Sequence, residues 1–158
     1  MVEMPHDRQK TTATPTRVSV LFNAAHPLLA TWAMALRCLE RRGALAVYQP
    51  DATLRGQLDH ALWECFTTDF VPHLEAGHPL AGHTPVVLWP VPPPAGTACV
   101  LSLASHVLPD APAYHHVIDV VGSTPTERHD GRTRWRHYRQ LGLDPIAFNL
   151  DHNHLPQP

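Results

Sequence analysis

The sequence predicts an α/β fold in which helices flank a mostly parallel sheet. Three observations lead to this prediction: 44% of the 158 residues are apolar, short apolar runs are typical of buried strands, and helix-periodic segments separate several of these runs. Strands that alternate with helices usually form a parallel sheet covered on both faces. The length suits one domain with a substantial core. We place it at residues 17–146, between a disordered leader at 1–16 and a flexible tail at 147–158.

The first half of the domain is predicted to run strand, helix, strand, helix. Residues 17–22 form the first strand, and Pro27 begins a helix that Gly43 ends. The core stripe of this helix has the helical spacing of apolar residues: Leu28, Trp32, Ala35, Leu36 and Leu39. Residues 44–48 form the second strand, and Asp51 is the N-cap of the next helix. The buried face of that helix is expected to comprise Leu54, Leu58, Ala61, Leu62 and Cys65.

The second half is predicted to contain three further strands and one helix. Residues 66–84 are expected to form a long loop, and strands follow at 85–89, 98–103 and 115–121. The first two of these strands are joined by the proline-rich connector at 90–96, which is stiff for its length.

The last helix has clear start and stop signals. Thr124 and Glu127 have the spacing of a capping box, in which each side chain bonds the other residue's backbone. Gly142 follows the last periodic residue and ends the helix. Tyr138 and Leu141 are assigned to its core face, with Arg134 beside them.

Five of the eleven arginines lie between residues 128 and 139 of this helix. At about 100° per residue, one face carries four of them around an indole. The members of this arginine stripe are Arg128, Arg132, Trp135, Arg136 and Arg139. Such a stripe suits an acidic partner that also has an aromatic end. The alternative is an ordinary solvated helix face.

Other features exclude several classes of function. The formal net charge is −2, so positive charge is local and no general attraction to nucleic acid or membrane is expected. A phosphate-binding loop and a G-x-S-x-G nucleophile motif are both absent. The thirteen histidines do not have metal-ligand spacing, so we expect loop histidines, no metal and no cofactor. No apolar run is long enough to span a membrane, and the first residues do not resemble a signal peptide. The three cysteines are widely spaced, so we expect a cytoplasmic protein with reduced thiols.

Three blocks of sequence resemble the chi subunit family of bacterial DNA polymerase III. They are LDHALW at 58–63, FVPH at 70–73 and RWRHYRQLG at 134–142, and the strand VLSL at 100–103 is also similar to a family strand. The resemblance covers about residues 17–146. It implies a nucleotide-binding-like (Rossmann-like) three-layer architecture without the phosphate loop, and no catalytic site.

The resemblance also implies partners and binding residues. Family members are clamp-loader accessory subunits that act in DNA replication, and are grouped with DNA-directed DNA polymerase as subunits of that holoenzyme. One surface binds the acidic C-terminal tail of single-stranded DNA-binding protein; carried over, this site is Arg128, Arg132, Trp135 and Arg136, and Arg139 extends it. A second surface docks the psi subunit, and in some members an accessory helicase; here it falls on Trp63, Phe70, Val71 and Pro72.

Two other functions remain open at this point. The same helix would suit direct binding of single-stranded nucleic acid, since arginines contact phosphates and an aromatic ring stacks on a base. A diverged enzyme would instead need a ligand pocket near the carboxyl ends of the strands.

Overall fold

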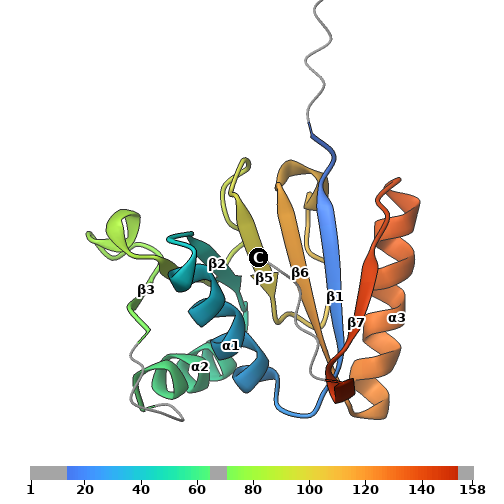
Figure 1. Cartoon of the computed structure of the whole chain (residues 1–158), viewed down its shortest axis with the longest axis horizontal. Helices are drawn as coiled ribbons and strands as arrows, with labels where there is room; N and C mark the ends of the chain where they lie inside the picture. The colour runs from blue at the N-terminus through green and yellow to red at the C-terminus, as the bar shows by residue number, and fades with distance from the viewer. Residues whose placement is uncertain (1–13, 65–70, 153–158) are drawn as a thin grey trace, which may run out of the picture.

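The computed structural model describes residues 14–64 and 71–152, and its centre is a seven-stranded sheet (Figure 1). The strand order is β3-β4-β2-β5-β6-β1-β7, and every neighbouring pair is parallel. The strands are β1 (Arg17–Ala24), β2 (Leu45–Tyr48), β3 (His73–Glu75), β4 (Val86–Trp89), β5 (Cys99–Ser102), β6 (His116–Gly122) and β7 (Ile146–Asn149). The predicted α/β fold with a mostly parallel sheet is confirmed.

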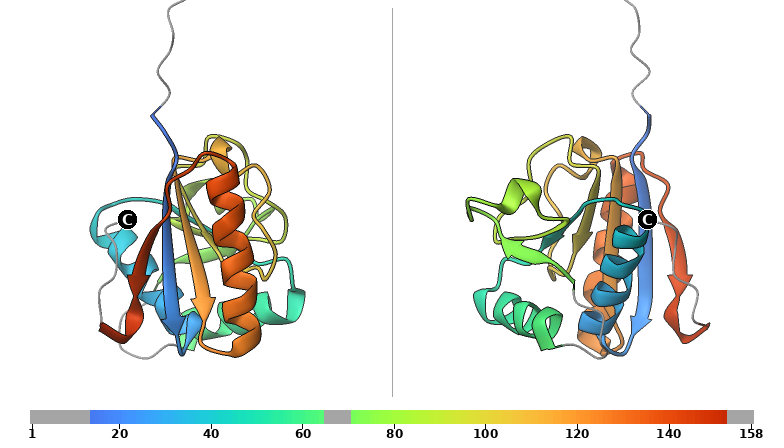
Figure 2. Two further views of the ribbon diagram at one scale, coloured as in Figure 1. Left: turned by 90° about the vertical axis from the view of Figure 1, so that its right-hand side faces the viewer. Right: turned by 60° about the vertical axis from the view of Figure 1, so that its left-hand side comes forward.

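Helices cover both faces of this sheet and make the fold three-layered (Figure 2). The described residues form the α-helices α1 (Pro27–Glu40), α2 (Ala52–Glu64) and α3 (Pro125–Gln140), and the short 3-10 helices η1 (Ala81–His83), η2 (Ala111–Ala113) and η3 (Leu150–His152). Helices α1 and α2 share one face, and α3 lies on the other. None of the helices in the described ranges is long and apolar enough to cross a membrane.

Two apolar clusters fill the space between the layers. Successive strand residues point to opposite faces, so Leu21 of β1 packs with α1 and α2 while Val20 packs on the α3 side. Tyr138 anchors α3 in the second cluster and is fully buried. Leu141, predicted to share that core face, is instead 41% exposed, because it lies just beyond the last helical turn as the C-cap of α3. That part of the prediction is wrong.

Two strands lie where none was predicted. Residues 73–75 of the expected long loop form β3, which pairs with β4. The predicted flexible tail from residue 147 is wrong over its first residues, because Ile146–Asn149 forms β7 alongside β1. Phe148 packs against the α1-side cluster, and burial of that ring favours the strand.

The buried face of α2 also differs from its prediction. Leu58 and Leu62 are buried as expected, whereas Leu54 is 46% exposed. Leu54 lies in the first turn, where it lines a hollow at the carboxyl ends of the strands rather than the core. Cys65 lies outside the described residues.

Candidate functional site

A hollow of about 420 Å³ lies between α3 and the edge of the sheet formed by β6, β1 and β7. We call it the α3 hollow. Helix α3 contributes Arg128, Gly131, Arg132 and Trp135. The sheet contributes Val20, Phe22 and Asn23 from β1, Val121 from β6 and Ala147 from β7. The floor is therefore apolar, while two guanidinium groups lie at its rim.

The first turn of α3 positions Arg128 through the predicted capping box, which is confirmed. The Thr124 hydroxyl accepts a hydrogen bond from the Glu127 backbone N–H at 3.2 Å, and the Glu127 carboxylate accepts one from the Thr124 N–H at 3.0 Å. Together these bonds satisfy two backbone donors that the helix itself leaves unpaired. The start of α3 is thereby fixed relative to the end of β6.

Gly131 lets α3 approach the sheet closely beside the hollow. A Cβ atom at this position would lie 2.6 Å from Cγ1 of Val121, which is closer than carbon atoms can approach. Gly131 was not predicted to have a role in the helix packing. A glycine inside a helix of otherwise long side chains is the signal that would have identified it, because glycine disfavours helix unless packing requires it.

A buried polar cluster fixes α3 on its sheet-facing side. Nε of Arg134 donates to both carboxylate oxygens of Asp119, at 3.0 and 2.9 Å, and the Tyr138 hydroxyl donates to the same carboxylate at 2.9 Å. Further Arg134 donors reach the backbone oxygens of Ser105 and Val120. Residue spacing placed Arg134 beside Tyr138, but did not reveal that Asp119 would meet it inside the protein.

Burial and the neighbouring charges act in opposite directions on the pKa values of Asp119 and Arg134. Burial raises the pKa of the Asp119 carboxyl, against the opposing charge and hydrogen bonds of Arg134 and the hydroxyl of Tyr138. Burial acts to lower the pKa of Arg134, but the neighbouring carboxylate outweighs it and raises that pKa. A guanidinium group does not lose its proton in proteins, so Arg134 supplies a permanent positive charge to the pair.

The structure brings together only part of the predicted arginine stripe. Arg128, Arg132 and Trp135 line the α3 hollow, and the half-buried indole packs against the core on that side. Arg136 and Arg139 are exposed on the same helix but do not line the hollow. Within the described ranges, none of the four guanidinium groups of the stripe has a carboxylate partner. The rim of the hollow is therefore suited to an anion.

The second predicted surface is only partly exposed. Trp63 is 56% exposed, with its ring centroid 5.1 Å from that of His73, and Pro72 is half-buried. Val71 is fully buried in the α1-side cluster, so its expected place in an exposed patch is wrong: the residue fills the core instead. Phe70 lies outside the described residues. Docking of a partner at this surface stays a prediction.

His73 supports that surface, whereas the sequence predicted only a loop histidine there. It is buried, with Nδ1 2.7 Å from the backbone oxygen of Val71 and Nε2 3.1 Å from Oδ1 of Asp59. Nδ1 donates to the Val71 carbonyl oxygen, which can only accept, and Nε2 lies at ion-pair distance from the Asp59 carboxylate. The ring thus ties the start of β3 to α2 beneath Trp63.

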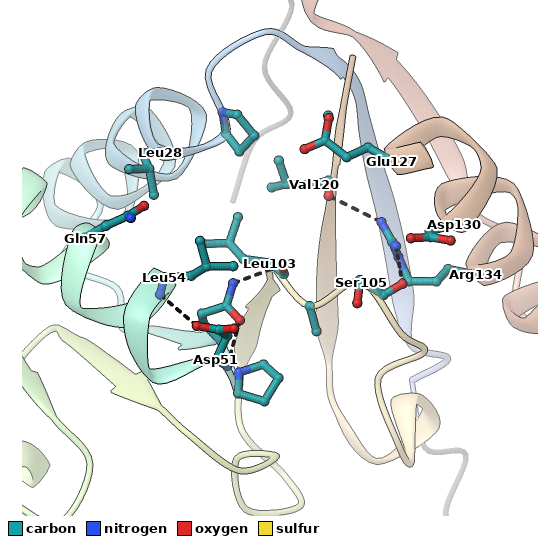
Figure 3. Close-up of a pocket in the computed structure, with 15 residues that line it drawn as sticks. Leu28, Asp51, Leu54, Gln57, Leu103, Ser105, Val120, Glu127, Asp130 and Arg134 are labelled. Carbon is teal, nitrogen blue, oxygen red and sulfur yellow. Dashed lines mark hydrogen bonds between the residues drawn. The ribbon is translucent and has the colours of Figure 1, made fainter. Parts of the chain in front are cut away.

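A second hollow, of about 400 Å³, lies at the carboxyl ends of the strands (Figure 3). Asp51, Glu127 and Asp130 line it beside Arg134, whose charge is already paired with Asp119, so the three carboxylates there repel phosphate. Asp51 is engaged as the N-cap of α2, accepting from the N–H groups of Thr53 and Leu54 at 2.9 and 3.0 Å. Among the described residues there is no group of three or more side chains suited to a metal ion. This hollow does not favour nucleotide chemistry.

Comparison with known proteins identifies one family. The family model described as DNA polymerase III chi subunit, HolC, matches residues 16–145 of this chain. The match includes the whole of α3 and the strands that line the α3 hollow, apart from β7. A search of curated proteins found no match.

Proposed function

This chain belongs to the DNA polymerase III chi subunit family, and from that premise we propose that it acts as a non-catalytic adaptor in DNA replication. It binds the C-terminal tail of single-stranded DNA-binding protein at the α3 hollow and links it to the clamp loader. Membership makes the chain an accessory subunit of the polymerase. In this proposal, polymerase chemistry belongs to other subunits, and the adaptor works with them in the cytoplasm.

The observation that carries the proposal is the pairing of an apolar floor with a cationic rim in one hollow. The tail expected from the resemblance has acidic residues, then proline and a terminal phenylalanine. An aromatic ring fits among Phe22, Val121 and Trp135, while the free carboxylate and the aspartates reach Arg128 and Arg132. Guanidinium groups bind carboxylates with two parallel hydrogen bonds where geometry allows.

Charge and apolar contact have different roles in this recognition. The net charge of the chain is −2, so the positive stripe of α3 is a local feature that guides an acidic peptide to one place. Arg136 and Arg139 extend that positive potential beyond the hollow. The aromatic contact at Trp135 then anchors the end of the tail, as buried aromatic groups do in many interfaces.

The clamp-loader side of the adaptor is proposed to lie around Trp63. On α2, Trp63 is a large apolar side chain that remains 56% exposed, and exposed apolar area of this kind is typical of interaction surfaces. Phe70 and Pro72 complete the proposed site. Its partner is a psi-like subunit, and an accessory helicase is an alternative occupant of the same surface.

A second candidate function is direct binding of single-stranded nucleic acid by α3. Four guanidinium groups without carboxylate partners in the described ranges favour it, because they would contact phosphates while Trp135 stacks on a base. The half-buried position of Trp135 in the hollow argues for a ligand that inserts an end group instead.

A competition experiment separates these functions. A fluorescent peptide that copies the acidic tail is bound to the full chain, and unlabelled peptide or single-stranded oligonucleotide is then titrated in. The proposal predicts that the unlabelled peptide displaces the labelled one. An oligonucleotide added at the same total negative charge should displace little of it. Displacement by the oligonucleotide at least as strong as by the peptide would favour the nucleic-acid function.

A further inference from the structure

A third hollow, of about 430 Å³, opens where β1, β5 and β6 begin; Figure 1 shows the starts of these three strands on its upper side. It lies at the opposite end of these strands from the carboxyl-end hollow. Its walls include Cys38 and Arg41 from the end of α1, Arg17 from β1, Cys99 from β5 and His116 from β6. The adaptor function proposed above uses none of these side chains.

Two free cysteines meet in this hollow. Cys38 and Cys99 are 61 positions apart in the sequence and lie on different layers of the fold, yet both line this one hollow and each thiol shifts the pKa of the other. Both residues are buried against the α1-side cluster while still lining the hollow. Small molecules that enter the hollow therefore reach both thiols.

The two thiols are chemically unequal. The hydrogen bond from Cys99 lowers the pKa of Cys38; burial opposes that effect, and the charge of Arg41 adds to it. The same hydrogen bond, together with burial, raises the pKa of Cys99. Cys38 therefore ionises first, with the Cys99 S–H as the donor to its sulfur. Since the thiolate is the nucleophilic form, Cys38 is the more reactive of the two.

The surroundings of Cys99 are polar and rigid. The Arg17 guanidinium donates to Nδ1 of His116 at 2.9 Å, so the ring carries its proton on Nε2 and donates to the Ser19 hydroxyl at 2.9 Å. Sγ of Cys99 lies 3.9 Å from the same Nδ1. The charge of Arg17 also acts to lower the pKa of Cys99. It therefore favours ionisation of Cys99 once Cys38 no longer carries a negative charge.

We propose that Cys38 and Cys99 form a dithiol site that hydroperoxides oxidise to an intramolecular disulfide, with Cys38 as the attacking sulfur and Cys99 as the resolving sulfur. The site is a modification site separate from the α3 hollow. It joins the end of α1 to the start of β5 when it is oxidised.

The chemistry balances in two steps. The Cys38 thiolate attacks one oxygen of the peroxide, the O–O bond breaks, and hydroxide leaves and takes up the proton that Cys38 had released, giving water and a sulfenic acid. Cys99 sulfur then attacks Cys38 sulfur, the S–O bond breaks as S–S forms, and the departing hydroxyl leaves as water with the Cys99 proton. Two thiols and one hydrogen peroxide become one disulfide and two waters.

The test uses the full chain with Cys65→Ser, so that the third cysteine cannot exchange. Limited hydrogen peroxide is added without denaturant, and intact mass and free thiols are followed together. We expect loss of both thiols, a mass decrease of about 2 Da and no covalent link between molecules. Cys38→Ser in this background should react slowly, whereas Cys99→Ser should stop at a sulfenic acid that dimedone traps. Equal reactivity of the two single variants, or a product linked between molecules, would overturn the proposal.

A second measurement shows whether the folded site is what reacts. The oxidation rate is compared without urea and in urea just below the unfolding transition. A preformed dithiol predicts a rate that does not rise with urea, and an oxidised product with a higher unfolding midpoint, because the disulfide closes a long loop. A rate that increases with urea would mean that oxidation needs unfolding, and the proposal would fail.

Discussion

Arg134 and Asp119 form a buried ion pair, in which Nε of the arginine donates to both carboxylate oxygens of the aspartate at 3.0 and 2.9 Å. The side chains are 4% and 1% exposed. The pair links the middle of α3 to β6 and fixes the rotation of the helix about its axis. Its neighbour in sequence, Trp135, is thereby directed into the α3 hollow with Arg132.

Replacement of Arg134 by Met should destabilise the protein by about 3–5 kcal/mol, because it leaves the Asp119 carboxylate buried without a counter-charge. The matched control is Arg132→Met on the same helix, where the exposed side chain predicts a change within about 0.5 kcal/mol. Urea unfolding followed by circular dichroism gives both values. Equal stability of the two variants would mean that the ion pair does not hold α3.

Replacement of Gly131 by Ala should also destabilise the protein, by about 1–3 kcal/mol, since the new methyl group overlaps the Val121 side chain. Gly56 is the control, because it is helical and a Cβ there meets no atom within 4 Å. Gly56→Ala should be neutral or stabilise by up to about 1 kcal/mol. In a Val121→Ala background, Gly131→Ala should cost less than it does in the parent, because the smaller side chain leaves space for the new methyl group. A Gly131→Ala variant as stable as the parent would contradict the close approach of α3 to β6.

His116 should make stability depend on pH. Burial and the charge of Arg17 lower its pKa from 6.5 to about 4. The unfolded chain therefore binds the proton between these values while the folded chain does not, so stability falls as pH decreases from about 6.5 to about 4. The loss is at most about 3.5 kcal/mol, since one pKa unit corresponds to about 1.4 kcal/mol.

The variant His116→Asn keeps a donor and an acceptor but cannot titrate. Its free energy of unfolding should change less with pH over this range than that of the parent, whereas the exposed neighbour His115→Asn should leave the pH dependence unchanged. The same pH dependence in His116→Asn and the parent would refute this assignment.

The parts of the fold with strong local signals were predictable from the sequence. The capping box at Thr124 and Glu127 depends only on neighbouring residues. The apolar runs that form β1, β5 and β6 favour buried strands at any position within a covered sheet. The three residues of the stripe that line the hollow share one side of α3 by helical periodicity alone. These features need no knowledge of the rest of the chain.

The features that were missed depend on contacts between distant segments. Helical spacing placed Arg134 beside Tyr138, but its buried ion pair depends on Asp119, which is fifteen positions away in the sequence. Strand β7 is short, and its first two residues are exposed. It forms a strand because it pairs with β1, and its composition alone does not indicate this. Val71 is buried because the chain turns into β3 there, and no periodic pattern in a three-residue strand could show that.

The two ends of the arginine stripe should contribute unequally to tail binding. Arg132 lines the α3 hollow and Arg139 does not, so Arg132→Ala should cost about 1.5–3 kcal/mol of binding free energy, as expected for a charge-assisted hydrogen bond. Arg139→Ala should cost less than about 0.5 kcal/mol, and that small effect should disappear at high salt. Equal losses would place the tail along the exposed stripe instead of in the hollow. Fluorescence anisotropy at low and high salt measures both.

The most direct test is a double-mutant cycle between Trp135 and the terminal phenylalanine of the tail peptide. Binding is measured for the parent chain and Trp135→Ala, each with the full peptide and with one that lacks the phenylalanine. The proposed contact predicts that each change weakens binding and that the two are coupled by about 0.5–1.5 kcal/mol, as for aromatic pairs. Additive effects with no coupling, or binding that ignores the terminal ring, would contradict recognition of the tail in the α3 hollow.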